Sequence, residues 1–370
     1  MSMLTRPSEG CMPHFSRDEM SKTRISVGVL GATGTVGQMI VSLLKDNPWF
    51  ELGEVAASER TAGKSYGEAM SSRWNVSHEV PEFARDLTIK ECKPDLDCDV
   101  VLSALDSSVA FEIEEGFARA GYAVVSNARN HRMEHDVPLL IPEVNADHVQ
   151  LIDVQRKNRG WDGLIATNPN CSTIQLCLAL KPLQDAFGVE KVMVTTMQAL
   201  SGAGYPGVPS LDALDNVIPY IGGEEEKMEN EPLKILGSMS GSRITNADMT
   251  ISAHCNRVPV RNGHTESVSV KLARDAGEED IINSFNSFNP LRDMNLPSSP
   301  RHPVIYLNQE NRPQPKLDAN VGNGMASVVG RLRRCNILDY KFTVLGNNLI
   351  RGAAGGTILN AELLKIKNFV

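Results

Sequence analysis

The chain has 370 residues, which is too long for a single compact core and indicates two domains. Apolar residues make up 41% and charged residues 22%, and the formal net charge is −8, so we expect a globular protein without a basic nucleic-acid-binding surface. No apolar run approaches the roughly 18 residues that a membrane helix needs, so no membrane partner is expected.

Two further features favour a cytoplasmic protein. Residues 1–23 are polar and lack the apolar stretch of a secretory signal, so we predict a disordered extension there. The chain has seven cysteines and no C-x-x-C pair, which argues against a disulfide framework and against a structural zinc site. We therefore expect reduced thiols and no metal.

The first structured segment is predicted to be a nucleotide-binding turn. Residues 25–30 form an apolar run typical of a buried parallel strand, and residues 31–37 read Gly-Ala-Thr-Gly-Thr-Val-Gly before an apolar-periodic helix. In this context glycines let the backbone approach a pyrophosphate at the helix N-terminus. The spacing G-x-x-G-x-x-G differs from the commoner G-x-G-x-x-G, so a plain tight turn stays open as an alternative.

The end of the second strand indicates which dinucleotide binds. Residues 52–57 are followed by Ser58, Glu59 and Arg60. A protein that binds NAD usually ends this strand in an acid that holds the ribose 2′-hydroxyl, whereas an arginine accommodates a 2′-phosphate. Ser58 and Arg60 therefore favour NADP, and Glu59 is the residue that argues against it.

The order of the predicted elements changes near residue 170. Before it, strands at 100–105, 122–126 and 164–167 alternate with helical segments, which predicts a doubly wound parallel sheet. After it, strand-like segments with few helices between them predict an antiparallel α+β domain. These segments are residues 191–199, 250–256, 265–274, 326–332 and 341–345. Residues 283–316 are rich in Asn and Pro and predict a long irregular connection.

Cys171 follows one of these strands at the start of a predicted helix. Pro169 and Asn170 fit a turn, and the residues after Cys171 have helical apolar spacing. The first N–H groups of a helix lack intrahelical partners and carry the positive end of its dipole, so a thiol placed there should ionise more easily and act as a nucleophile. The alternative is a small buried apolar residue, which is the role of most cysteines.

A histidine in the second half could serve this cysteine. Arg257 and His264 lie seven residues apart around a Pro/Gly bend, and the pKa of an unperturbed imidazole suits acid–base chemistry near neutrality. An ordinary surface histidine is the alternative, and His254 competes for the role. The residues Glu224–Lys227 are by default a solvated charge run.

Taken together, these segments resemble the aspartate-β-semialdehyde dehydrogenases from about residue 24 to the C-terminus. Each motif is weak alone, but their shared order along the chain is specific. The motifs are residues 31–37, 126–127, 132–133, 137–139, 141–145, 168–173, 198–204, 224–227, 257–264 and 347–353. The compact segment between Gly204 and Thr250 is similar to the archaeal and fungal branch of the family.

The resemblance implies a fold like that of glyceraldehyde-3-phosphate dehydrogenase. Residues 24–170 would form an α/β NADP-binding Rossmann domain, a doubly wound parallel sheet to which a C-terminal helix at 355–367 returns. Residues 171–354 would form an α+β catalytic and dimerisation domain. The implied assembly is a homodimer or homotetramer.

The resemblance also implies an activity and the residues that perform it. The reaction is the reversible, NADPH-dependent reduction of L-aspartyl-4-phosphate to L-aspartate-4-semialdehyde and inorganic phosphate, on the route to lysine, threonine and methionine. The implied catalytic residues are Cys171 as nucleophile, His264 as general acid and base, and Gln198, which orients the acyl group. The implied substrate-binding residues are Arg257 for the α-carboxylate, Glu224 for the ammonium, and Arg132, Lys227 and Asn127 for the phosphate. The implied NADP contacts are Gly31, Ala32, Thr33, Gly34, Thr35, Val36, Gly37, Ser58, Arg60, Ser103, Ser201, Gly202 and Asn348.

Three other functions remain open from the sequence. A sister reductase could act on malonyl-CoA or on N-acetylglutamyl phosphate with the same chemistry, although free phosphate explains the pair Arg132 and Lys227 better than an acyl-CoA does. A non-catalytic NADP-sensing module would leave Cys171 inert. A cysteine hydrolase would explain Cys171 and His264 but not the nucleotide-binding turn.

Overall fold

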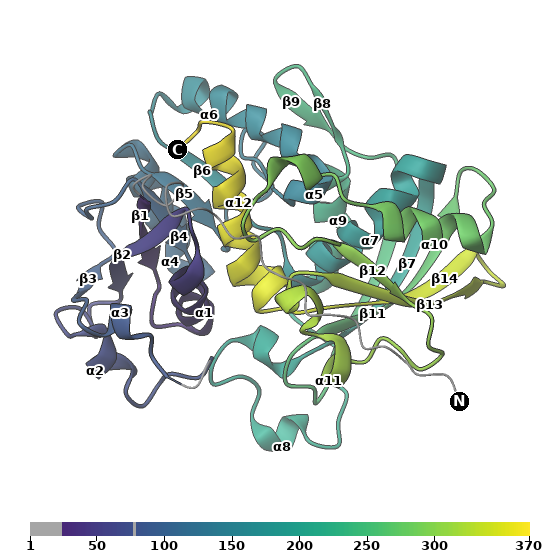
Figure 1. The fold of residues 1–370 in the computed structure, drawn as a ribbon, viewed down its shortest axis with the longest axis horizontal. Coiled ribbons are helices and arrows are strands. Elements are labelled where there is room, and N and C mark those ends of the chain that lie inside the picture. Colours follow the sequence, from purple (N-terminus) through teal and green to yellow (C-terminus); the bar gives the residue numbers. More distant parts are fainter. Residues whose placement is uncertain (1–23, 77–78) are drawn as a thin grey trace, which may run out of the picture.

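The computed structural model describes residues 24–76 and 79–370, so the predicted N-terminal extension lies outside the described residues. Figure 1 shows two sheets on opposite sides of the C-terminal helix. The first sheet is entirely parallel and has the order β3-β2-β1-β4-β5-β6. Its strands are β1 (Ile25–Leu30), β2 (Phe50–Ala57), β3 (Ile89–Glu91), β4 (Val100–Ser103), β5 (Ala123–Ser126) and β6 (Leu164–Thr167). This is the strand order of a dinucleotide-binding Rossmann fold, so the predicted doubly wound sheet is confirmed.

Helices connect and cover this first sheet. The longer ones are α1 (Thr35–Leu43), α4 (Ser107–Arg119) and α6 (Leu151–Arg159), and the shorter ones are α2 (Tyr66–Met70), α3 (Glu82–Arg85) and α5 (Pro142–Asn145). The apolar strands explain the parallel arrangement, because β4, β5 and β6 are buried along their whole length. The short edge strand β3 was not predicted from the sequence.

The C-terminal helix α12 (Gly355–Ile366) packs on this first sheet. Its Ile358, Leu359 and Leu363 are buried in the same apolar cluster as Val27 and Val29 of β1. A π-helical turn at Ile350–Ala354 leads into α12. The end of the chain therefore links the second half of the molecule to the nucleotide-binding sheet.

The second sheet has the order β10-β7-β11-β14-β13-β12. Its strands are β7 (Val189–Gln198), β10 (Thr250–Arg257), β11 (His264–Leu272), β12 (Val304–Leu307), β13 (Ser327–Arg334) and β14 (Tyr340–Gly346). The three central pairings are antiparallel, but β10 runs parallel to β7 and β12 runs parallel to β13. The prediction of an antiparallel sheet is therefore wrong at both edges, because each of these connections is long enough to bring the chain back in the same direction.

Residues 283–316 are more regular than the sequence suggested. They include the end of α10 (Glu278–Ser287), the edge strand β12 and the start of α11 (Pro315–Asp318). The prediction of a long irregular connection is therefore wrong where these elements form. The apolar run of β12 is only four residues long, and it becomes a strand because β13 supplies its hydrogen-bonding partner.

Helices cover one face of the second sheet. Apolar side chains of α7 (Cys171–Phe187), α9 (Glu224–Ile235) and α10 belong to one core cluster with those of β7, β11 and β14. On the other face, alternate residues of β7 are exposed, including Met193 at 50% exposure. The second half also contains the short helix α8 (Ser210–Ala213) and a hairpin of β8 (Ser238–Ser240) and β9 (Arg243–Thr245).

Candidate active site

Cys171 is the first residue of α7, directly after the turn that follows β6. Asn170 caps this helix, because its side-chain oxygen accepts hydrogen bonds from the backbone N–H groups of Ser172 at 3.0 Å and Thr173 at 3.1 Å. The predicted position of Cys171 at a helix start is confirmed. The cap leaves the backbone N–H of Cys171 itself beside the thiol.

His264 is the partner of Cys171. Its Nε2 lies 3.1 Å from the Cys171 sulfur, and its Nδ1 accepts a hydrogen bond from the backbone N–H of Ala199 at 3.0 Å. Because Nδ1 accepts, the neutral imidazole carries its proton on Nε2, which faces the sulfur. His254 is exposed on β10. The structure therefore pairs His264, and not His254, with the cysteine.

The ionisation of this pair differs from the sequence-based expectation. Burial, followed by the charge of Glu224, raises the pKa of Cys171 to about 12, and Lys227, Arg132 and Arg257 oppose that shift. Burial lowers the pKa of His264 to about 3. The pKa of Cys171 in the free site is therefore shifted in the direction opposite to the expectation of easy ionisation, because desolvation of a charged sulfur outweighs the opposing effect of the three cations.

Glu224 lies at the centre of a buried hydrogen-bond network. Its carboxylate accepts hydrogen bonds from Lys227 Nζ at 2.5 Å, Asn170 Nδ2 at 2.7 Å and Gln198 Nε2 at 3.0 Å. Burial alone would raise the pKa of Glu224, but Lys227 and these hydrogen bonds outweigh it and keep the pKa below its ordinary value. The default interpretation of a solvated charge run is wrong for Glu224, which is 4% exposed, whereas Glu226 is exposed.

Arg257 is the last residue of β10, and its Nη1 donates a hydrogen bond to the backbone oxygen of Ala199 at 2.9 Å. Gly202 lies against Arg257 and His264. A methyl group at Gly202 would come within 2.9 Å of Arg257 Nη1 and 3.0 Å of His264 Cε1. Only glycine therefore lets the backbone approach the guanidinium and the imidazole this closely.

Arg132 and Asn127 lie in the loop after β5. Arg132 is buried, and its guanidinium donates to Glu231 Oε1 at 2.9 Å and to the backbone oxygen of Asn127 at 2.7 Å. Its Nε has no hydrogen-bond partner. The Asn127 side chain donates to the Ser103 backbone oxygen at 3.0 Å. A buried guanidinium with unused donors is suited to binding an anion.

The predicted nucleotide turn has the geometry that a pyrophosphate needs. Gly31 has a φ of 72°, and a methyl group at Gly37 would lie 2.3 Å from the Gly31 carbonyl oxygen. The buried Thr35 hydroxyl, at the first residue of α1, has no hydrogen-bond partner. Val36 continues this helix, while Ala32 and Thr33 complete the turn before Gly34, its N-cap. The residues present therefore fit a dinucleotide.

The other predicted NADP contacts differ in whether their side chains are exposed or buried. Ser58 and Arg60 are exposed just beyond the end of β2. The side-chain Nδ2 of Asn348 donates to Ser201 Oγ at 2.8 Å, which joins two of the predicted contacts. The structure does not present the Ser103 hydroxyl to the turn, because it is fully buried and donates to Glu114 Oε1 at 2.6 Å.

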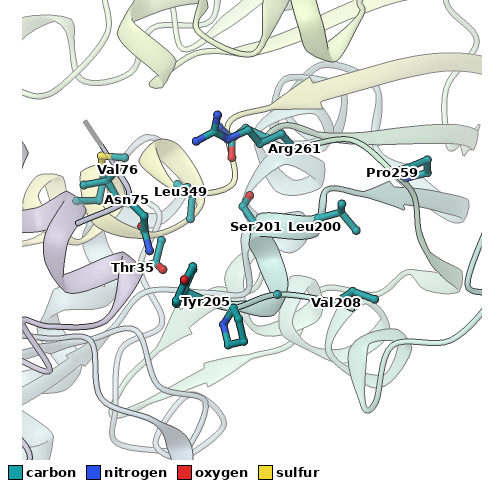
Figure 2. Close-up of a pocket in the computed structure, with 15 residues that line it drawn as sticks. Thr35, Asn75, Val76, Leu200, Ser201, Tyr205, Val208, Pro259, Arg261 and Leu349 are labelled. Carbon is teal, nitrogen blue, oxygen red and sulfur yellow. The ribbon is translucent and has the colours of Figure 1, made fainter. Parts of the chain in front are cut away.

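A cavity of about 440 Å³ opens between the two halves of the molecule. Figure 2 shows Thr35, Asn75 and Val76 on one side of this cavity and Leu200, Ser201 and Pro259 on the other. Thr35 belongs to the glycine turn, and Ser201 precedes the Gly202 that contacts His264. The cavity therefore lies between the nucleotide turn and the loop that carries Gly202.

Several residues of the site were not predicted. Glu231 and Lys234 continue the buried face of α9. A sequence signal for them was available, because their spacing from Glu224 and Lys227 places all four charged residues on one helix face. Gly352 lies in the π-helical turn, where a methyl group would come within 2.6 Å of Cys171 Cβ. Nothing in the sequence pattern indicates that contact.

Neither a metal cluster nor a membrane span is found within the described ranges. Residues 24–76 and 79–370 contain no group of three or more His, Cys, Asp or Glu side chains placed to hold a metal ion. Among the same residues, no helix has the length and apolar character to cross a membrane.

Two family models match the chain. One is described as "semialdehyde dehydrogenase, NAD binding domain" and matches residues 26–152, which include the glycine turn. The other is described as "semialdehyde dehydrogenase, dimerisation domain" and matches residues 180–351, which include His264. Fold and site together define an oxidoreductase of the semialdehyde dehydrogenase class.

Individual relatives narrow this class. The chain is 54% identical over 342 residues to an aspartate-semialdehyde dehydrogenase of Archaeoglobus fulgidus, covering 92% of this chain and 98% of the relative. It is 46% identical over 349 residues to that of Schizosaccharomyces pombe, covering 91% and 97%. A crystal structure of aspartate semialdehyde dehydrogenase with NADP from Candida albicans matches with a TM-score of 0.86 at 42% identity, covering 94% of this chain and all of that one. The chain belongs to the aspartate-semialdehyde dehydrogenase family, and the predicted likeness to archaeal and fungal members is confirmed.

Proposed function

We propose that this protein catalyses the reversible, NADPH-dependent conversion of L-aspartyl-4-phosphate to L-aspartate-4-semialdehyde and inorganic phosphate. The observation that carries this proposal is the 3.1 Å contact between His264 Nε2 and the Cys171 sulfur, with Arg257 and Glu224 beside it. Residues 24–170, with the helix at 355–367, would bind NADP. Residues 171–354 would provide catalysis and the subunit interface.

The proposed reaction begins at the thiol. Cys171 attacks the acyl carbon as a thiolate, phosphate leaves toward Arg132, Lys227 and Asn127 and takes up the proton that the thiol gives up, and a thioester remains. NADPH, when bound, supplies a hydride to this thioester. The backbone N–H of Cys171 stabilises the resulting oxyanion, while Gln198 orients the acyl group. His264 then acts as the general acid: its Nε2 proton moves to the sulfur as the thiolate departs, and a proton from solvent restores the neutral imidazole.

Glu224 and Lys227 are proposed to exchange partners when substrate binds. In the free site they neutralise each other through a 2.5 Å contact. The substrate brings an ammonium group for Glu224 and a phosphoryl group for Lys227, so both side chains keep an opposite charge nearby. The exchange therefore leaves neither buried charge without an opposite partner while substrate is bound.

Arg60 is proposed to select NADP over NAD. It is exposed just beyond β2, where a 2′-phosphate would lie. A charge-assisted hydrogen bond contributes roughly 1.5–3 kcal/mol, so Arg60→Ala should weaken NADP binding about 10- to 100-fold and change NAD binding little. Titration of both cofactors tests this. Equal catalytic efficiency of the unmodified enzyme with NAD and NADP would contradict it.

A single comparison of activities tests the proposed reaction against its nearest alternative. NADPH formation from L-aspartate-4-semialdehyde should require added phosphate, and reduction of malonyl-CoA or of N-acetylglutamyl phosphate should be negligible. The pair of cations near the thiol supports the phosphate-dependent reaction, because Arg132 and Lys227 both act on Cys171 electrostatically. Efficient reduction of either alternative substrate would instead assign the chain to a sister activity.

The proposed partner is a second copy of the chain. The dimerisation model spans the second sheet, and the sheet face opposite α7 leaves Met193 half-exposed. We propose that this face is the interface of a homodimer, and that two such dimers would form the alternative homotetramer. Analytical ultracentrifugation of the protein and of Met193→Asp tests this, because the variant should dissociate.

A cytoplasmic location is also proposed, since the reaction requires a reduced Cys171 and the cysteines of the described residues are all free.

A further inference from the structure

Four charged residues follow one face of α9. Glu224, Lys227, Glu231 and Lys234 are spaced three, four and three residues apart, so they lie along the same side of the helix. The first two contact each other at the substrate site. The last two are almost fully buried, at 2% and 5% exposure, and no step of the proposed reaction uses them.

Glu231 connects two parts of the site. One carboxylate oxygen accepts the hydrogen bond from Arg132 Nη1 at 2.9 Å, and the other accepts one from the backbone N–H of Asn170 at 2.8 Å. Asn170 is the residue before Cys171 and caps its helix. A single buried carboxylate therefore sets the position of the Arg132 guanidinium relative to the nucleophile.

Lys234 fixes the backbone of the same loop. Its Nζ donates hydrogen bonds to the carbonyl oxygens of Arg132 at 2.7 Å, Glu134 at 2.7 Å and Val137 at 2.8 Å. Residues 127–137 form neither a helix nor a strand, and only turn hydrogen bonds, such as the one from the Arg132 N–H to the Arg129 carbonyl oxygen, connect their backbone locally. The loop that carries Arg132 is thus attached to α9 through both its side chain and its main chain.

We propose that Glu231, supported by Lys234, is a positioning residue that holds Arg132 in register with Cys171 for the phosphoryl group. This inference rests on the proposed phosphate-binding role of Arg132. Glu231 uses only one of the five guanidinium N–H donors and Asn127 another, and the buried Nε has no partner. Arg132 therefore keeps donors for an anion while Glu231 restrains its orientation.

If the Glu231 carboxylate is removed, a purely electrostatic role and a positioning role predict opposite changes in phosphate affinity. Loss of a negative charge near an anion site would by itself tighten phosphate binding. Loss of the restraint would weaken it, because the guanidinium must then be ordered by the ligand at an entropic cost. The sign of the change in phosphate affinity consequently distinguishes a positioning role from a simple charge effect.

The test is phosphate-dependent NADPH formation from L-aspartate-4-semialdehyde. Glu231→Gln should raise the KM for phosphate about 10- to 100-fold, as expected for loss of one charge-assisted hydrogen bond, with little change in the KM for NADP. Glu226→Gln is the matched control, since it removes the same charge from an exposed position of the same helix and should leave all constants unchanged.

Lys234→Gln provides an independent variant that keeps Glu231 in place. It should raise the KM for phosphate in the same direction, and it decides the question alone if Glu231→Gln does not fold. The inference is overturned if the unmodified enzyme depends on phosphate but the folded variants show an unchanged or lower KM for phosphate. A wild-type enzyme without any phosphate dependence would instead refute the proposed function.

Discussion

Cys171→Ser is expected to reduce kcat by several orders of magnitude while NADPH binding remains nearly intact. Loss of a catalytic nucleophile typically costs more than about 10⁴-fold, because a serine hydroxyl neither ionises as readily nor forms a thioester. The substitution changes one atom at the start of α7 and leaves the Asn170 cap in place. Steady-state kinetics and a fluorescence titration with NADPH measure the two quantities separately.

A covalent adduct identifies the nucleophile directly. After the protein is mixed with L-aspartyl-4-phosphate in the absence of NADPH, mass spectrometry of its peptides should locate the acyl group on Cys171. Cys335→Ser serves as the control, because this thiol lies in the turn between β13 and β14 and should not affect turnover. Acylation of Cys177 or Cys255 would show that the wrong cysteine has been assigned.

Features encoded by consecutive residues could be predicted from the sequence. The strand, glycine turn and helix at the N-terminus are one local unit, as are β6, the Asn170 turn and α7. In each unit the turn residues and the apolar periodicity point to the same structure, so local preferences are sufficient. The proposed pyrophosphate-binding turn, Gly31–Gly37, and the proposed nucleophile, Cys171, both lie in these units.

Features that depend on distant parts of the chain could not be predicted in this way. The acidity of Cys171 follows from its burial and from Glu224, which is far away in sequence, and not from the helix start alone. Ser103 is the last residue of a recognisable strand, but its hydroxyl donates a hydrogen bond to Glu114. The parallel edge pairs of β10 and β12 likewise depend on which strand each one meets. Tertiary context outweighs local preference at all of these positions.

His264→Gln is expected to lower kcat by roughly 10²–10⁴-fold, the usual contribution of general acid–base catalysis, with a much smaller change in KM. His264 acts on charge that appears only as the thiohemiacetal collapses, so its loss affects the transition state more than substrate binding. Arg257→Lys should do the opposite and chiefly raise KM, because lysine keeps the charge but loses the two-pronged carboxylate contact. His254→Gln is the control at an exposed histidine of β10.

The pH dependence of stability gives a second measurement on the same variant. Burial lowers the pKa of His264 from 6.5 to about 3, so between these values the unfolded chain binds a proton at this residue that the folded protein does not. The unmodified protein should therefore lose stability relative to His264→Gln as the pH falls below about 6.5, by at most about 1.4 kcal/mol per pH unit. Urea unfolding of both proteins at several pH values measures this difference. A constant difference from pH 7 to pH 4 would show that the imidazole is not held neutral, and a loss of kcat in His254→Gln instead would assign catalysis to the other histidine.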